Sequence, residues 1–395
     1  MLGLFTTVSS SMIVVNALPA IASGLGTTSS GALWVVLASL VTMTIATPVW
    51  GKLADHLDKK RLTQASILIF VVASIGAALA PGLGALVAMR ALQGVATGGL
   101  LAMSQATLGA ITTPRQRGAY SGYLGAVMSV ATLCGPLIGG IVVDIPGLGW
   151  RWCFLLLLPL AVAGLVIVQL TLRAPATRAP MRVDLAETIG MLRNRTTLWA
   201  IVGSVSLGLV TFSSVLFLSQ YLQLGRGYSA STAGILAVPM LSATLVASIV
   251  AGHLVARRGR VGGVLLGGSV LMAAGFAALA TVGVSAPDWL AIVATIPVGA
   301  GIGMLMQNFV LAAQNALDHL WVGRVSATLS FVRSLAGAAG VAGLGAIVAG
   351  LAGADPEPAA QARATGVVFA IAAFASLAAL VAAFALRGQR LRGTI

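Results

Sequence analysis

Apolar runs of about 20 residues recur along the chain between short polar loops, and each can cross a bilayer as a helix. In lipid, only helices and closed barrels satisfy every backbone polar group. The runs therefore predict an all-α polytopic membrane protein with twelve transmembrane helices. Their approximate limits are 2–25, 32–51, 62–80, 84–110, 118–143, 152–172, 197–222, 230–255, 261–284, 288–314, 322–351 and 365–386.

The composition excludes the soluble classes. The chain is 58% hydrophobic and 8% charged, whereas soluble domains have about 45–50% and about 25%. The net charge is +14, but the cations lie in short loops and form no single stripe, so we expect no nucleic-acid partner. Cys134 and Cys153 lie in apolar surroundings without metal-ligand spacing. We expect no metal, no cofactor and no disulfide.

The basic loop at 51–61 sets the predicted orientation. It follows fifty residues that carry no charge. Lys and Arg collect in cytoplasmic loops, so this loop and every second loop after it are expected inside, with both termini. The opposite loops carry only three cations, Arg151, Arg226 and Arg363. The chain begins almost inside its first span, and we expect a short cytoplasmic leader before it.

The segment 173–196 is the predicted linker between two halves, 1–172 and 197–395. Pro175 and Pro180 interrupt helix, and five arginines keep the segment in water. Four apolar residues within it recur at helical spacing. They indicate either an amphipathic helix on the inner membrane surface or a loosely ordered tether. These residues are Val183, Ala186, Ile189 and Leu192.

The two halves repeat each other. The glycines Gly94 and Gly98 of the fourth span return as Gly299 and Gly303 in the tenth. The basic segment that begins at Gly51 returns at 252–260. A third set matches between the fifth and eleventh spans at one offset: Ser121, Gly135 and Gly140 with Ser326, Gly340 and Gly345. The repeat predicts two pseudo-symmetric six-helix bundles with a substrate site between them near the middle of the membrane.

These motifs resemble those of the major facilitator superfamily, over essentially the whole chain. The loop 51–61, Arg90–Gly94 and Gly135–Gly140 are similar to its signatures in the second loop, the fourth span and the antiporter fifth span. The segments 16–19 and 149–154 are closest to the drug:proton antiporter branch. The resemblance implies proton-coupled export by alternating access. It also implies gating roles for Gly51, Asp55, Arg61, Gly135, Pro136, Gly139 and Gly140.

The chain departs from that branch in three places. The branch has fourteen spans, two of them between the halves, where this chain has only its linker. The branch usually has Asp nine residues before the proline of the first span, and Ser10 stands there. His56 and Asp58 stand where the loop signature expects Arg and Gly.

None of the nine acidic residues lies at the centre of a predicted span. Transporters of protons or cationic drugs normally carry a titratable group there. We therefore expect a neutral or anionic substrate. Asp55 and Asp144 are the candidate proton carriers, and the alternative is that both only fix loop geometry. The resemblance also implies that Asp55 locks an inner gate near the start of the eleventh span.

Two arginines lie inside predicted spans, where each costs about 2.5–3.5 kcal/mol unless it faces a cavity or a partner. Arg333 is expected either to contact an anionic or carbonyl group of a substrate or to bond helix carbonyls. The resemblance implies a role for Arg90 in proton transfer. Because Ser10 replaces the expected acid, its candidate hydrogen-bond partners are Asn16, Gln105 or Gln307.

The fifth and tenth spans carry further candidates. Gly135, Pro136, Gly139 and Gly140 predict close helix approach and a bend, read either as a hinge and seal or as ordinary packing. Gln307 and Asn308 recur seven residues later as Gln314 and Asn315. They predict a polar face on the substrate pathway. The predicted pathway is Ser10, Asn16, Arg90, Gln105, Gln307, Asn308 and Arg333.

Taken together, these features predict a twelve-span secondary transporter of the bacterial plasma membrane. We expect a monomer that exports drug-like or secondary-metabolite compounds and that is coupled to protons. The alternative is a facilitator or importer of a small neutral or anionic metabolite. The chain shows no constellation of catalytic residues that an intramembrane enzyme would need, so we do not expect an enzyme.

Overall fold

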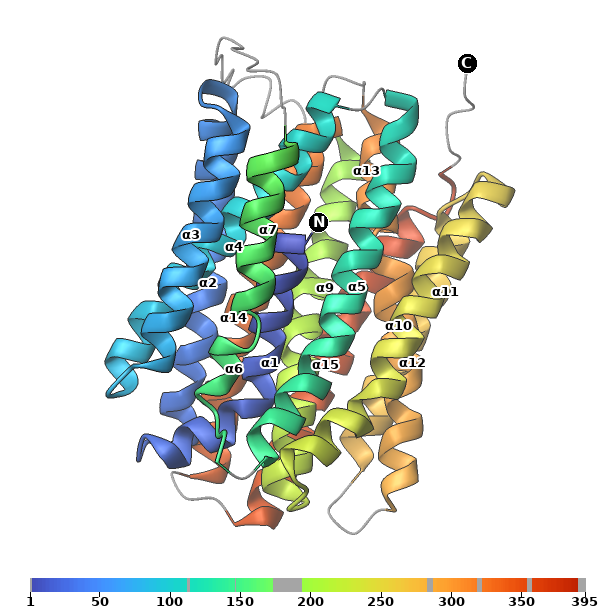
Figure 1. Cartoon of the computed structure of the whole chain (residues 1–395). Helices are drawn as coiled ribbons and strands as arrows, with labels where there is room; N and C mark the ends of the chain where they lie inside the picture. The colour runs from blue at the N-terminus through green and yellow to red at the C-terminus, as the bar shows by residue number, and fades with distance from the viewer. Residues whose placement is uncertain are drawn as a thin grey trace. The chain divides into compact units, whose positions relative to one another are not determined.

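The computed structural model describes residues 2–111, 114–145, 147–172, 194–282, 287–317, 322–353 and 357–389. These residues form helices and no strands (Figure 1). The first half contains α1 (Leu2–Gly24), α2 (Ser29–His56), α3 (Lys59–Ala78), α4 (Leu83–Ile111), α5 (Pro114–Asp144), α6 (Trp152–Leu155) and α7 (Leu158–Thr171). The second half contains α9 (Arg195–Gln220), the π-helix η1 (Tyr221–Gly225), α10 (Ala230–Arg258), α11 (Gly262–Thr281), α12 (Asp288–Met306), α13 (Asn308–Ala316), α14 (Val322–Ala352) and α15 (Pro358–Ala385).

Eleven helical stretches in the described chain are long and apolar enough to cross a membrane, when α6 with α7 and α12 with α13 each count as one. A twelfth, Val130–Asp144 in α5, is apolar but shorter over its described part. The prediction of an all-α polytopic membrane protein is confirmed.

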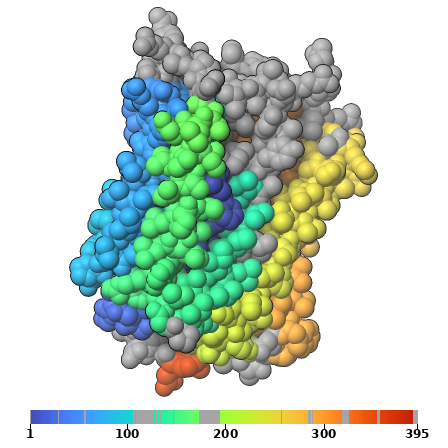
Figure 2. Space-filling model, in the orientation of Figure 1, coloured from blue at the N-terminus to red at the C-terminus, as the bar shows by residue number. Residues whose placement is uncertain are grey.

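The chain divides into two compact units, Met1–Met181 with Tyr228–Ile235, and Arg182–Gly227 with Leu236–Ile395. In the first unit, α2 packs along α4, α1 along α5, and α3 against both α4 and α7. Figure 2 shows α3 in blue beside α7 in green. The first turns of α10 belong to this unit, while the rest of α10 belongs to the second.

Glycines set the closest helix crossings in both units. A Cβ at Gly98 on α4 would lie 2.7 Å from the carbonyl oxygen of Met43 on α2. In the second unit, a Cβ at Gly303 on α12 would meet the carbonyl oxygen of Thr244 on α10. Gly303, which the sequence repeat pairs with Gly98, therefore lies at the equivalent crossing in the second unit. Both positions hold glycine because only a residue without a side chain lets two backbones approach this closely.

The predicted loop at 51–61 is mostly helical, so its prediction as a loop is wrong. Helix α2 continues to His56 and α3 begins at Lys59, which leaves two residues between them. The Asp58 carboxylate caps α3 by accepting a hydrogen bond from the backbone N–H of Lys60 at 2.8 Å. The apolar run ends near residue 51, but a helix can continue into water. The predicted amphipathic segment 183–192 lies outside the described residues.

Two predicted spans are interrupted. Between α6 and α7, Pro159 occupies the first turn of α7, where its missing N–H costs nothing. Between α12 and α13, Gln307 is the single residue that separates the helices.

Arg151 and Trp150 tie the start of α6 to two other helices of the first unit. The guanidinium of Arg151 donates to the carbonyl oxygens of Ala78 and Ala80, each at 3.0 Å, at the end of α3. It also lies 4.4 Å from the centroid of the Trp150 ring, and this ring packs against Gly24 at the end of α1. The segment 149–154 therefore has a structural role as a clamp.

Candidate functional site

Helices α1 and α5 make their closest approach at the glycines of the fifth span. A Cβ at Gly139 would lie 3.0 Å from the Cα of Ile13, and one at Gly135 would meet Met12. Pro136 lies between these glycines and has no N–H to continue the helix ladder. Its own carbonyl oxygen accepts a hydrogen bond from Nδ2 of Asn16 at 2.9 Å.

The start of α10 packs on the other side of the same segment. A Cβ at Gly140 would lie 2.8 Å from the Cα of Ser231, and one at Gly234 would lie 2.6 Å from the carbonyl oxygen of Pro136. The same position on Gly234 is 3.1 Å from Nδ2 of Asn16. Three helices of the first unit thus meet here. We call this set the three-helix junction: Asn16, Pro136, Gly140, Asp144, Ser231 and Gly234.

Asp144 ends α5 and caps α10. Its Oδ2 accepts a hydrogen bond from the backbone N–H of Ser231 at 2.8 Å. Partial burial acts to raise the pKa of this carboxyl. Hydrogen bonds from the side chain and backbone of Ser231, then from Ser229 and Ala230, outweigh it, so the net pKa is lowered. An anion at a helix N-terminus is also favoured by the helix dipole.

Arg90 is held within α2, α3 and α4. Its side chain is 1% exposed. Nε donates to the carbonyl oxygen of Val35 at 3.0 Å, and Nη1 donates to Oε1 of Gln93 at 2.8 Å. Gln93 in turn donates to Oγ of Ser74 at 2.7 Å.

The hydrogen bonds of Arg90 go to Val35 and Gln93, and the predicted partner Asn16 bonds Pro136 instead. Gln105 and Gln307 stay predictions, because the side chain of Gln105 lies outside the described residues and Gln307 belongs to the other unit. The sequence did contain a signal for the observed partner, because Gln93 follows Arg90 by three residues and so lies on the same helix face.

Ser10 is also buried, with 1% of its surface exposed. Its Oγ has no hydrogen-bond partner among the described residues. The neighbouring Ser9 donates to the carbonyl oxygen of Ala131 on α5 at 3.3 Å. Ser10 therefore provides a hydroxyl group on α1 at the position where the drug:proton antiporter branch usually has an aspartate.

Arg333 lies half-buried on α14 in the second unit. Its Nη1 donates to the carbonyl oxygen of Met306, the last residue of α12, at 3.4 Å. This contact matches the expected alternative of an arginine bonded to a helix carbonyl. The distance is at the long end for such a bond.

The interruption at Gln307 divides the predicted polar face. Gln307 is exposed, whereas Asn308 is 5% exposed and its Nδ2 donates back to the carbonyl oxygen of Met304 at 2.6 Å. Gln314 donates to Oγ of Ser326 on α14 at 2.6 Å. The seven-residue spacing from Gln307 to Gln314 crosses the interruption, so these two do not share one continuous helix face.

Three predicted gating residues lie at the junction of α2 and α3. Gly51 is within α2, and a Cβ there would meet nothing within 4 Å, so packing does not require glycine. Arg61 is exposed on α3. The side chain of Asp55 lies outside the described residues, as does its predicted contact with the start of the eleventh span.

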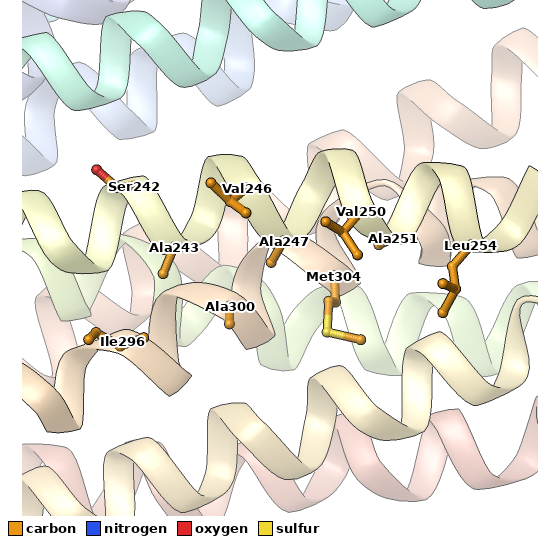
Figure 3. Close-up of a pocket in the computed structure, with 10 residues that line it drawn as sticks. All are labelled: Ser242, Ala243, Val246, Ala247, Val250, Ala251, Leu254, Ile296, Ala300 and Met304. Atoms are coloured by element: carbon orange, nitrogen blue, oxygen red, sulfur yellow. The ribbon is translucent and has the colours of Figure 1, made fainter.

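A groove of about 420 Å³ runs between α10 and α12 in the second unit. Figure 3 shows the residues that line it, which are α10 residues from Ser242 to Leu254 and the α12 residues Ile296, Ala300 and Met304. Among the described residues, Ser242 is its only polar lining residue, and no predicted pathway residue lines it.

The chain belongs to the Major Facilitator Superfamily, whose family model matches residues 1–341. The predicted resemblance and the major facilitator fold are confirmed. Members of this family are transporters that bind small molecules in a membrane, and they are not enzymes.

Two transporters are similar to the chain in sequence, and a third is similar in fold. It is 26% identical to the multidrug transporter protein MdtP of Bacillus subtilis, over 85% of this chain and 72% of MdtP. It is 29% identical to the uncharacterized MFS-type transporter Rv1877 of Mycobacterium tuberculosis, over 84% of this chain but only 56% of that protein. Its fold matches a bacterial homologue of the lysosomal transporter Spinster with a TM-score of 0.78, at 14% identity, over 100% of this chain and 97% of that one.

Proposed function

We propose that this chain is a secondary active transporter that exports drug-like or secondary-metabolite compounds by alternating access. The bacterial plasma membrane is its expected location, with both termini inside, because the cations collect in alternate loops. The similarity to a multidrug transporter supports drug-like substrates, and the 35% identity to the efflux pump dotC of Dothistroma septosporum, over 45% of this chain and 30% of that protein, supports export.

The observation that carries this proposal is the three-helix junction. Alternating access needs a contact between a helix of each sequence half that can form and break. At the junction, Gly140 of α5 lies against the backbone of Ala230 and Ser231, and Gly234 of α10 lies against the carbonyl oxygen of Pro136 and the amide of Asn16. Pro136 removes a backbone hydrogen bond at the same level, so α5 can bend there. In this proposal Gly135, Pro136, Gly139 and Gly140 form a hinge and an outer seal.

A second candidate function is a facilitator or importer of a small neutral or anionic metabolite. The absence of acidic residues from the centre of every predicted span favours it, because a uniporter needs no central proton carrier. Coupling to protons separates the two candidates.

The test is an accumulation assay in a host that lacks its own efflux pumps. Expression of the chain is expected to lower the steady-state level of several drug-like compounds, and a protonophore is expected to restore it. Unchanged accumulation with the protein present in the membrane would contradict export. Flux that persists at full rate with the protonophore would select the facilitator.

A further inference from the structure

The two arginines inside the spans differ in how many donors they use. A guanidinium has five N–H donors and no acceptor. Arg90 is almost completely enclosed and bonds both Val35 and Gln93. Arg333 is half-buried, and among the described residues its only hydrogen bond is the 3.4 Å contact with Met306. Arg333 therefore has donors available to another group.

The position of Arg333 is fixed by its backbone. A Cβ at Gly208 on α9 would lie 3.0 Å from the Cα of Arg333, and one at Gly337 would meet the ring of Phe212. Helix α14 thus packs against α9 at Arg333 and one turn beyond it. The side chain extends to the end of α12, next to the exposed Gln307. A rigid support of this kind is what a binding side chain needs.

The chain supplies no carboxylate to pair with Arg333 from the centre of any predicted span. The acidic residues of the linker stand at 184 and 187, and those of the second half at 288, 318, 355 and 357, all in loops or at span ends. An arginine inside a span costs about 2.5–3.5 kcal/mol without a partner. One carbonyl oxygen at 3.4 Å offsets little of that cost.

From this difference we infer that Arg333 and Gln307 form a subsite for the carboxylate of an anionic substrate. This inference rests on the proposed transport function and names its substrate class. A planar carboxylate accepts two parallel hydrogen bonds from one guanidinium. In this proposal the amide of Gln307, the residue that follows Met306, supplies a further donor. Arg333 lies about 12 Å from the start of the apolar stretch Val325–Ala352, at 1.5 Å per residue, which is deeper than a lipid headgroup reaches.

The test uses three compounds on one aryl scaffold: 1-naphthaleneacetic acid, its methyl ester, and 1-naphthylmethylamine. Binding is measured as thermal stabilisation of the purified full chain in phosphatidylcholine nanodiscs. The variants are Arg333→Gln, Arg333→Lys and, as a control for the loss of one cation, Arg363→Gln. Arg363 is exposed near the start of α15.

We expect the carboxylate to bind more tightly than the ester or the amine. Arg333→Gln should weaken carboxylate binding by about 10- to 100-fold and leave ester binding unchanged, since a hydrogen bond to a charged group is lost. Arg333→Lys keeps the positive charge but lacks the planar fork of N–H donors, so its affinity for the carboxylate should lie between those of the wild type and Arg333→Gln. Arg363→Gln should match the wild type. The melting temperature of each ligand-free variant verifies that it is folded.

Equal binding of the carboxylate and the ester by the wild type would overturn the inference. So would an equal loss of both in Arg333→Gln. A second set of nanodiscs contains phosphatidylglycerol, and competition by this lipid would assign the site to a headgroup and overturn a substrate subsite. Export of neutral compounds by Arg333→Gln in the accumulation assay would leave the proposed function intact when the subsite fails.

Discussion

Asp144 offers the sharpest test of the three-helix junction. Asp144→Ala removes the carboxylate that accepts the backbone N–H of Ser231 at 2.8 Å. Loss of such a cap costs about 0.5–2 kcal/mol. If the contact exists only while α5 and α10 are together, the open fraction of the junction should rise by about 2- to 30-fold.

Asp144→Asn is the matched variant, because Asn caps a helix about as well as Asp. It loses only the attraction between the charge and the helix dipole, which is about 0.3–1 kcal/mol at an exposed site. The open fraction should then rise by no more than about 5-fold.

The same pair of variants separates a structural cap from a proton carrier. The pKa of Asp144 is lowered from its ordinary value of 3.8, since hydrogen bonds from Ser231 outweigh the effect of partial burial. A lowered pKa means that the contact is stable above the ordinary value and is lost only as pH falls through the lowered value. Between pH 5 and 8 the carboxylate stays ionised. Asp144→Asn should therefore keep any proton-driven export.

Hydrogen–deuterium exchange, read by mass spectrometry on a peptide covering 228–240, reports this contact directly. After correction for intrinsic rates, exchange should be faster in Asp144→Ala, much less so in Asp144→Asn, and independent of pH from 5 to 8. Glu357→Ala is the control, because Glu357 precedes α15 without a side-chain cap bond. Wild-type exchange in Asp144→Ala, or equal acceleration in both Asp144 variants, would refute the reasoning.

Two further substitutions test the helix contacts of the first unit. Gly139→Ala places a Cβ 3.0 Å from the Cα of Ile13. The variant should therefore reach the membrane but lose most transport, because overpacking costs about 1–3 kcal/mol. Gly84→Ala is the control and should transport normally, since a Cβ at Gly84 would meet nothing within 4 Å. An accumulation assay with membrane quantification compares the two, and equal activity would contradict the packing argument. Arg151→Ala breaks the bonds to Ala78 and Ala80 and should lower stability by about 1–3 kcal/mol. Thermal unfolding in detergent measures this loss, and an unchanged midpoint would rule out the clamp.

The length of apolar runs predicted that the chain forms helices long enough to cross a membrane, but it did not predict where those helices end. Helix α2 was expected to stop near residue 51, and it continues to His56. An apolar run records the thickness of the hydrocarbon core, whereas a helix ends where its backbone bonds are capped. Leu57 and Asp58 make that turn. The interruption before α7 had a visible signal in Pro159, but nothing in the sequence around Gln307 marked the end of α12.

The repeat could be predicted because close backbone crossings admit only glycine. Gly98 and Gly303 occupy matching crossings in the two units. The position of Asp144 on the first turn of α10 could not be predicted, since it joins residues 87 positions apart. Run length and charge carry no information about which loop end meets which helix start.

Arg90 and Arg333 show where sequence reasoning reaches its limit in the candidate site. Each stands alone in an apolar run, so the same insertion cost applied to both and predicted a partner for each. Arg90 donates hydrogen bonds to Gln93, three residues further along the same helix, and to the carbonyl oxygen of Val35 on the adjacent α2. Among the described residues, Arg333 bonds only the last carbonyl oxygen of α12, which is available because the helix ends at Met306. A helix end carries about half a negative charge. It therefore attracts the guanidinium without neutralising it, so positive charge remains beside Gln307. A permanently cationic compound would be repelled there, while an anionic one would complete the missing ion pair.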